Sequence, residues 1–187
     1  MRECEIRRAN SLAVDQNKLV GYAAVFGSWS RDLGGFVERV RPGAFRRSLE
    51  AETAADILAL SGHDVNAVLG RVGAGTLQLA EDAKGLRYSI DLPDTSEARD
   101  LRALVARGDV SGASFGFRVI EDDWLMDGAT ARRELIDVEL MEISVTALPA
   151  YPDTSVAKRH LAQLGQPCWQ REAEERQRLL AILRGAR

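Results

Sequence analysis

The chain has 187 residues, of which 45% are hydrophobic and 28% are charged. This composition is ordinary for a soluble globular protein, and the length suffices for one domain with a substantial core. The net charge of -3 leaves no broad basic surface, so we expect no nucleic-acid partner.

The sequence shows no signal for export or for a membrane. Its first residues lack the apolar core of a signal peptide, and no apolar run approaches the ~20 residues that span a bilayer. The two cysteines, Cys4 and Cys168, lie far apart in the sequence and form no metal or redox motif. We therefore expect a soluble, intracellular protein in a reducing compartment, with no membrane partner.

The first half of the chain contains several short apolar runs that are typical of buried strands. One run ends at Gly27, and another stops at the sequence Ser61-Gly62-His63-Asp64. Pro42 is placed to begin a short helix. The predicted strands are residues 19–26, 36–40, 55–60 and 67–72, and the predicted helix ends near residue 49.

Two clearer patterns follow. Residues 86–92 alternate strictly between apolar and polar, which predicts a half-buried strand paired with residues 76–79 in a hairpin. Asp94 followed by Glu97 resembles a capping pair at the start of a helix. Apolar residues at helical spacing then continue to Gly108, which predicts a helix up to that residue.

The stretch after Gly108 predicts a turn followed by a strand. Gly-Asp and Ser-Gly pairs favour tight turns, and apolar residues then recur at every second position. Phe115 and Phe117 lie on one predicted face, whereas Ser114 and Gly116 lie on the other. A small hydroxyl beside a glycine, anchored by aromatic residues behind it, is one way for a strand to present a nucleophile.

The last part of the chain is predicted to contain two more strands and a helical tail. Residues 121–131 are polar and irregular, and the strands that follow are 133–140 and 141–146. The composition then changes, with two helical stretches and a break between them. We predict a mainly β domain, a barrel or sandwich with added helices, over residues 1–155, and a helical tail over residues 156–187.

One histidine is placed where it can act on a substrate. His63 follows an apolar strand in a loop, whereas His160 lies in a basic stretch of a predicted helix and is expected to be solvated. An imidazole beside a hydroxyl can remove its proton, so His63 and Ser114 are a candidate base and nucleophile. A zinc site fits poorly, because the cysteines are remote from His63.

A third group is needed to orient the imidazole and to stabilise its charged form. Glu142 is the candidate, since it faces away from the apolar side of its predicted strand. Asp64 and Glu139 compete for this role. Each of these residues has a plainer alternative, because Ser114 can be an ordinary strand serine and Glu142 a surface carboxylate.

Five stretches carry a further signal when they are read together. They are Gly21–Gly27, Glu38–Phe45, His63-Asp64 with Leu69-Gly70-Arg71, Ser111–Phe117, and Glu142–Thr146 leading to Pro149-Ala150-Tyr151-Pro152. In this order they resemble the prohead maturation proteases of tailed bacteriophages. The likeness covers roughly residues 19–155 and leaves out the tail.

The resemblance implies a fold like that of the herpesvirus capsid-maturation protease, a closed or nearly closed β-barrel with surrounding helices. It also implies a serine endopeptidase that cleaves scaffold or capsid-protein extensions, and often itself, inside an assembling procapsid in the host cytoplasm. The implied partners are the major capsid protein or the scaffold as substrate and further copies of the chain in a homo-oligomer. No cofactor is implied.

By the same resemblance, the family's histidine falls on His63 and its nucleophile on Ser114. In the herpesvirus enzymes the third member is a second histidine, whereas the corresponding strand here offers Glu142. Ser111 is a rival nucleophile, although its turn position before the strand suits it less. We expect backbone amides of residues 148–151 to bind the oxyanion, and the tail to be clipped during maturation.

Two other functions fit the same residues. The first is a non-enzymatic β-barrel that serves as a scaffold or shell component, with Ser114 merely structural. The second is an esterase, because residues 112–116 match the letters of the Gly-x-Ser-x-Gly elbow. That elbow requires a helix after the serine, and residues 117–120 have the pattern of a strand.

Overall fold

The computed structural model describes residues 4–9, 12–15, 17–30, 32–33, 35–127 and 130–147. The predicted helical tail, its boundary with the β domain and the loop 148–151 lie outside these residues. The predictions made for them therefore stay predictions.

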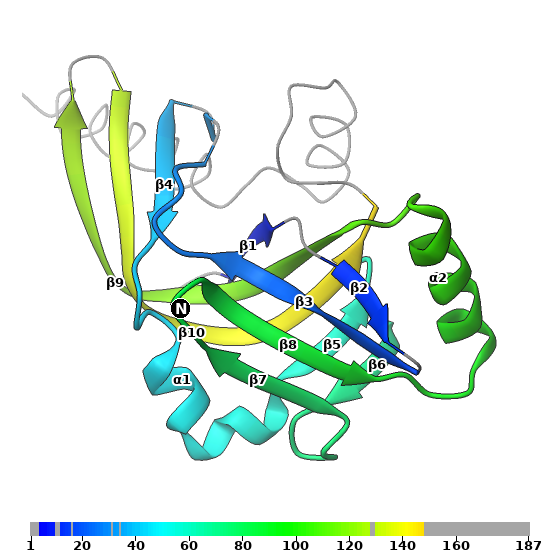
Figure 1. Ribbon diagram of the computed structural model, residues 1–187. Coiled ribbons are helices and arrows are strands. Elements are labelled where there is room, and N and C mark those ends of the chain that lie inside the picture. The colour runs from blue at the N-terminus through cyan, green and yellow to red at the C-terminus, as the bar shows by residue number, and fades with distance from the viewer. Residues whose placement is uncertain are drawn as a thin grey trace, which may run out of the picture. The chain divides into compact units, whose positions relative to one another are not determined.

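The described strands form two sheets (Figure 1). In the larger sheet β1, β9, β10, β5 and β6 are neighbours in that order, and β4 also pairs with β10. The smaller sheet has the order β2-β3-β8-β7. The larger sheet comprises β1 (Cys4–Ala9), β4 (Phe36–Val40), β5 (Leu58–Ser61), β6 (Asp64–Arg71), β9 (Gly112–Asp127) and β10 (Thr130–Thr146). The smaller comprises β2 (Leu12–Asp15), β3 (Lys18–Val25), β7 (Leu77–Glu81) and β8 (Gly85–Asp91).

Helices add little to the described part of the chain. They are α1 (Arg46–Glu50), the 3-10 helix η1 (Glu52–Asp56) and α2 (Ser96–Arg107), with α1 and α2 at opposite ends of the sheets (Figure 1). The strand predicted over 55–60 is correct only from Leu58, because residues 55 and 56 belong to η1 and Ile57 is its C-cap. Within the described ranges, no helix combines the length and apolar character needed to cross a membrane.

The predicted helix up to Gly108 is confirmed as α2. Its first turn is capped by Thr95, whose hydroxyl accepts the N–H of Ala98 at 3.3 Å, so the prediction that Asp94 caps it is wrong. Gly108 ends the helix with a φ of 88°, a left-handed conformation that costs glycine little.

The long hairpin of β9 and β10 corrects two sequence predictions. The stretch 121–131 is not irregular, because β9 continues to Asp127 and β10 begins at Thr130. The strands predicted at 133–140 and 141–146 are one strand, β10. This part of the hairpin is held by pairing between β9 and β10 and by β4, which runs parallel to β10, so its residues need not alternate in polarity.

A single apolar cluster joins the buried residues of both sheets. Rings of Phe115 and Phe45 lie 5.2 Å apart, and rings of Phe115 and Phe117 lie 5.0 Å apart between centroids. Burying each such side chain contributes about 1.5–3 kcal/mol to folding. The mainly β fold is thus confirmed. The closed barrel is not found among the described strands, because β1 and β6 end one sheet and β2 and β7 end the other.

Candidate active site

Ser114 lies on β9, a central strand of the larger sheet. It pairs with Arg8 of β1 on one side and with Ser144 of β10 on the other. Its strand neighbours Phe115 and Phe117 belong to the apolar core and have at most 1% of their surface exposed. Ser114 itself is 0% exposed. The aromatic residues therefore anchor the strand that carries the hydroxyl, as the sequence pattern predicts.

His63 lies in the two-residue turn that joins β5 to β6. Gly62 has a φ of 61° and His63 a φ of 65°, and positive values at both positions are those of a type I′ hairpin turn. His63 is the one non-glycine residue with a positive φ among those described, a conformation that costs on the order of 1 kcal/mol.

Strand β10 holds this turn in place. β5 runs parallel to β10, with Ser61 beside Val145, so the turn lies next to the end of β10. The N–H of Gly62 donates to the Val145 carbonyl at 2.9 Å, and the N–H of His63 donates to Oγ of Ser144 at 3.0 Å. These hydrogen bonds offset the strain of the turn and fix the position of the His63 backbone, from which the imidazole extends.

Glu142 comes to the same place through an irregularity in β10. The pairing of β10 with β9 shifts between Leu140, which lies opposite Phe117, and Glu142, which lies opposite Gly116. Met141 is the extra residue of this β-bulge, and bulges commonly re-aim side chains beside functional sites. Gly116 leaves room for the carboxylate, because a Cβ there would lie 2.7 Å from Oε1 of Glu142.

The three residues proposed from the sequence form one hydrogen-bonded chain. Oγ of Ser114 lies 2.7 Å from Nε2 of His63, and Nδ1 of His63 lies 2.8 Å from Oε1 of Glu142. A carboxylate only accepts hydrogen bonds, so Nδ1 carries the proton and Nε2 of the neutral ring accepts from the serine hydroxyl. The side chains of His63 and Glu142 are each 14% exposed. Such a chain can move the hydroxyl proton to the imidazole while the carboxylate stabilises the resulting cation.

A fourth residue, Ser144, belongs to this cluster and was not assigned a role from the sequence. Its Oγ accepts the N–H of His63 and donates to Oε2 of Glu142 at 2.8 Å. The sequence does carry one signal for it, since Ser144 follows Glu142 by two positions on the same predicted strand face.

The rival residues lie elsewhere. The Asp64 side chain is exposed and accepts hydrogen bonds from Asn66, and Glu139 lies 3.4 Å from Arg118 in an ion pair. Ser111 is exposed and precedes β9. Residues 112–116 lie within a strand, so the strand-to-helix context that the esterase elbow needs is absent from this described segment.

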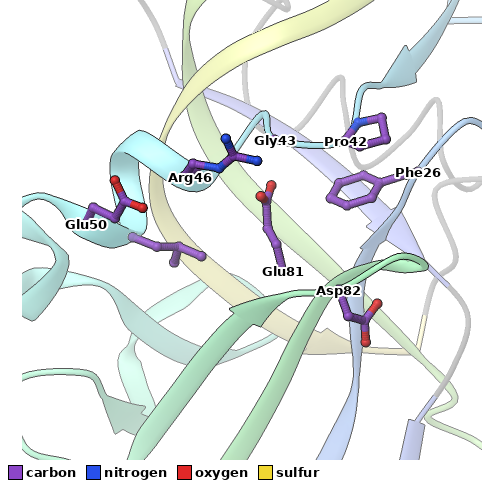
Figure 2. A pocket seen from close by; sticks show the side chains of 8 residues that line it. Phe26, Pro42, Gly43, Arg46, Glu50, Glu81 and Asp82 are labelled. Atoms are coloured by element: carbon purple, nitrogen blue, oxygen red, sulfur yellow. The ribbon is translucent and has the colours of Figure 1, made fainter.

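A second feature of the surface is a hollow of about 410 Å³ beside α1 and the end of β7 (Figure 2). Arg46 and Glu50 of α1 line it together with Glu81 and Asp82. Glu81 is already engaged, because its Oε1 accepts the N–H of Phe45 at 2.9 Å. The hollow contains none of the residues of the hydrogen-bonded chain. In the described ranges no group of three or more His, Cys, Asp or Glu side chains is placed to hold a metal ion.

Comparison with known proteins gives the site its context. Residues 3–167 match the family described as caudovirus prohead serine protease. The chain is similar to the prohead protease of Enterobacteria phage HK97, with 33% identity over 138 residues, which make up 73% of this chain and 57% of that relative. No solved structure matches the chain. On the extent of these matches, the chain belongs to the caudovirus prohead serine protease family.

Proposed function

We propose that the chain is a serine endopeptidase in which Ser114 is the nucleophile, His63 the general base and acid, and Glu142 the group that orients the imidazole. The observation that carries the proposal is the chain of hydrogen bonds from Oγ of Ser114 through the His63 ring to the Glu142 carboxylate. Membership of the prohead serine protease family supports the same activity.

The reaction is acyl transfer in two halves. Nε2 of His63 takes the proton of Ser114 as Oγ attacks the peptide carbonyl carbon, and the imidazolium then returns a proton to the departing amine. Water, deprotonated in turn by His63, attacks the ester on Ser114 and releases the acid product. Glu142 stabilises the imidazolium in both halves. Ser114 has no exposed surface, so a substrate carbonyl or a serine-directed reagent reaches Oγ only after neighbouring groups move.

We infer that the substrates are capsid-protein or scaffold extensions, together with the chain itself, inside an assembling procapsid. The name of the HK97 relative, a prohead protease, supports this assignment. The backbone amides of residues 148–151 remain our proposal for the oxyanion donors, each typically worth a factor of about 10²–10³ in rate.

We also propose a relation to the herpesvirus maturational protease. Its support is a mainly β fold with a serine on a central strand beside a histidine from a neighbouring turn. By the resemblance, Glu142 takes the role that a second histidine has in those enzymes. The described strands leave both sheets with open ends, so the proposed relation does not include a closed barrel.

The chemistry is tested by treating the protein with a fluorophosphonate, which phosphonylates activated serines with loss of fluoride. Wild type is expected to gain one phosphonyl group, mapped to Ser114 by peptide mass, and His63→Ala to lose this labelling. Ser111→Ala, which changes the exposed serine three positions earlier, serves as the matched control and is expected to label normally. Labelling at Ser111, or equal labelling of His63→Ala, contradicts the proposed roles.

The biological role is tested by co-expression with the major capsid protein from the same genome. Intact masses are expected to show shortening of the capsid protein or of the chain with wild type and none with Ser114→Ala, a loss on the order of 10⁵–10⁶ in rate. If wild type is labelled by the fluorophosphonate but neither protein is shortened, the capsid substrate is wrong and the hydrolase remains. If neither labelling nor shortening occurs, the scaffold function is preferred.

A further inference from the structure

Ser144 is a buried hydroxyl that the reaction described above does not use. It lies on β10 directly opposite Ser114 of β9 and is 0% exposed. A serine in such a position has no access to bulk solvent, so its hydrogen bonds within the protein account for its polarity.

The hydrogen bonds of Ser144 have fixed directions. A hydroxyl has one proton to donate and two lone pairs with which to accept. The backbone N–H of His63 can only donate, so Oγ of Ser144 accepts from it at 3.0 Å. The Glu142 carboxylate can only accept, so the Ser144 proton points to Oε2 at 2.8 Å.

These two hydrogen bonds form a closed ring together with a third, which runs from Nδ1 of His63 to Oε1 of Glu142 at 2.8 Å. Ser144 therefore ties the backbone of His63 to the same carboxylate that holds its imidazole. Rotation of the carboxylate, or movement of the turn, breaks a bond to Ser144 as well as changing the bond to the imidazole.

The conformation of the turn explains why the hydrogen bonds of Ser144 matter for the position of His63. His63 has a positive φ, so its backbone conformation is intrinsically unfavourable and needs support from its surroundings. The backbone N–H groups of this turn donate two hydrogen bonds to β10, one from Gly62 to the Val145 carbonyl and one from His63 to Oγ of Ser144. An imidazole displaced by as little as about 1 Å loses its alignment with the serine, and such misplacement costs on the order of 10² in rate.

We propose that Ser144 is a positioning residue that fixes the His63 turn and the Glu142 carboxylate in one register. The inference rests on the proposed function, since it concerns the rate at which Ser114 reacts. It assigns Ser144 no contact with the substrate.

The experiment measures phosphonylation of Ser114 at increasing fluorophosphonate concentration. Ser144→Ala is expected to lower the maximal labelling rate by about 10-fold to 10²-fold, with the half-maximal concentration unchanged. Ser144→Thr, which keeps a hydroxyl, is expected to recover most of that rate. Ser30→Ala is the matched control, because Oγ of Ser30 also accepts a backbone N–H, that of Glu38 at 2.8 Å, in another part of the sheet. It is expected to label at the wild-type rate.

The outcomes separate this inference from the proposed function. If wild type itself is not labelled at Ser114, the proposed function fails and takes the inference with it. If wild type is labelled and Ser144→Ala labels as fast, or if Ser30→Ala slows as much as Ser144→Ala, only the positioning role is overturned. A Ser144→Thr protein that melts like wild type yet stays as slow as Ser144→Ala also contradicts it. Where Ser144→Thr does not fold, the comparison of the two alanine variants decides.

Discussion

A group of buried and partly buried polar side chains lies at each end of the β9–β10 hairpin, but the two groups have different chemistry. The site cluster consists of His63, Ser114, Glu142 and Ser144. The second group, which we call the arm cluster, consists of Glu38, Asp122 and Arg133. In it Arg133 donates to Glu38 at 3.0 Å and to Asp122 at 2.7 Å.

The degree of burial does not distinguish the site cluster, for which we propose a catalytic role, from the arm cluster. The side chains of Arg133 and Glu38 are only 9% and 2% exposed, which is less than those of His63 and Glu142. The two clusters differ instead in proton mobility. A guanidinium does not lose its proton in a protein, so the arm cluster holds fixed charges. The site cluster instead connects a carboxylate to a hydroxyl through an imidazole, the one side chain suited to exchanging protons near neutral pH.

The largest difference between the two clusters is expected when one carboxylate charge is removed from each. Glu142→Gln keeps the shape of the side chain but removes the charge that, in the proposed mechanism, stabilises the His63 imidazolium. We expect a loss on the order of 10³–10⁴ in the rate of peptide hydrolysis. Glu38→Gln is the matched variant in the arm cluster and is expected to leave the rate per folded molecule unchanged. Both are measured by substrate cleavage after normalising to folded protein by circular dichroism.

Equal rate losses in the two glutamine variants would mean that the clusters do not differ in function. An unchanged rate in Glu142→Gln would reopen the choice of the third residue. Asp64→Asn and Glu139→Gln would then be compared directly, since these were the competing carboxylates in the sequence.

The converse experiment removes the cation of the arm cluster. Arg133→Met removes the guanidinium that pairs with the buried Glu38 carboxylate, and breaking a buried pair in this way typically costs about 3–5 kcal/mol of unfolding free energy. The expected result is a lower denaturant midpoint with unchanged cleavage by the molecules that remain folded. Urea titration followed by tryptophan fluorescence measures the first effect. A large loss of rate in folded Arg133→Met contradicts the division of roles.

The sequence predicted three candidate site residues from two sources, the local pattern around each residue and the resemblance to a known family. Apolar and small residues alternate along the strand of Ser114, with Phe115 and Phe117 on the face opposite the serine. His63 follows Ser61-Gly62 at the end of an apolar run, a sequence that is typical of a turn. The role of Ser144 was not predicted, because neither source points to this serine, and its partner on the turn lies 81 positions away in the sequence. Only the parallel pairing of β5 with β10 brings the two together, and no local pattern encodes that pairing.

The second half of β9, residues 121–127, was not predicted as a strand, for a related reason. β9 there contains Trp124, Leu125 and Met126, each at least 50% exposed. A strand with exposed apolar residues and no buried face lacks the alternation from which strands are inferred. This part of the hairpin is stabilised by contacts between residues far apart in the sequence, such as the hydrogen bond from Arg133 to Glu38 across 95 positions. A closed barrel, in turn, was inferred from family likeness, and strand pairing in the described residues does not close either sheet.

The smallest change with an expected effect on the site cluster is the addition of a single methyl group beside it. Gly116→Ala places a Cβ 2.7 Å from Oε1 and 3.1 Å from Cγ of Glu142, so the carboxylate has to shift by several tenths of an ångström. We expect the hydrolysis rate to fall by about 10-fold to 10²-fold, because Oε1 is the atom that accepts from Nδ1 of His63. Gly70→Ala is the control, since its Cβ would meet the Thr76 carbonyl at 3.0 Å and no residue of the site. It should lower stability without slowing the folded enzyme, whereas a rate loss as large as that of Gly116→Ala would show that the sheet, and not the position of the carboxylate, limits the reaction.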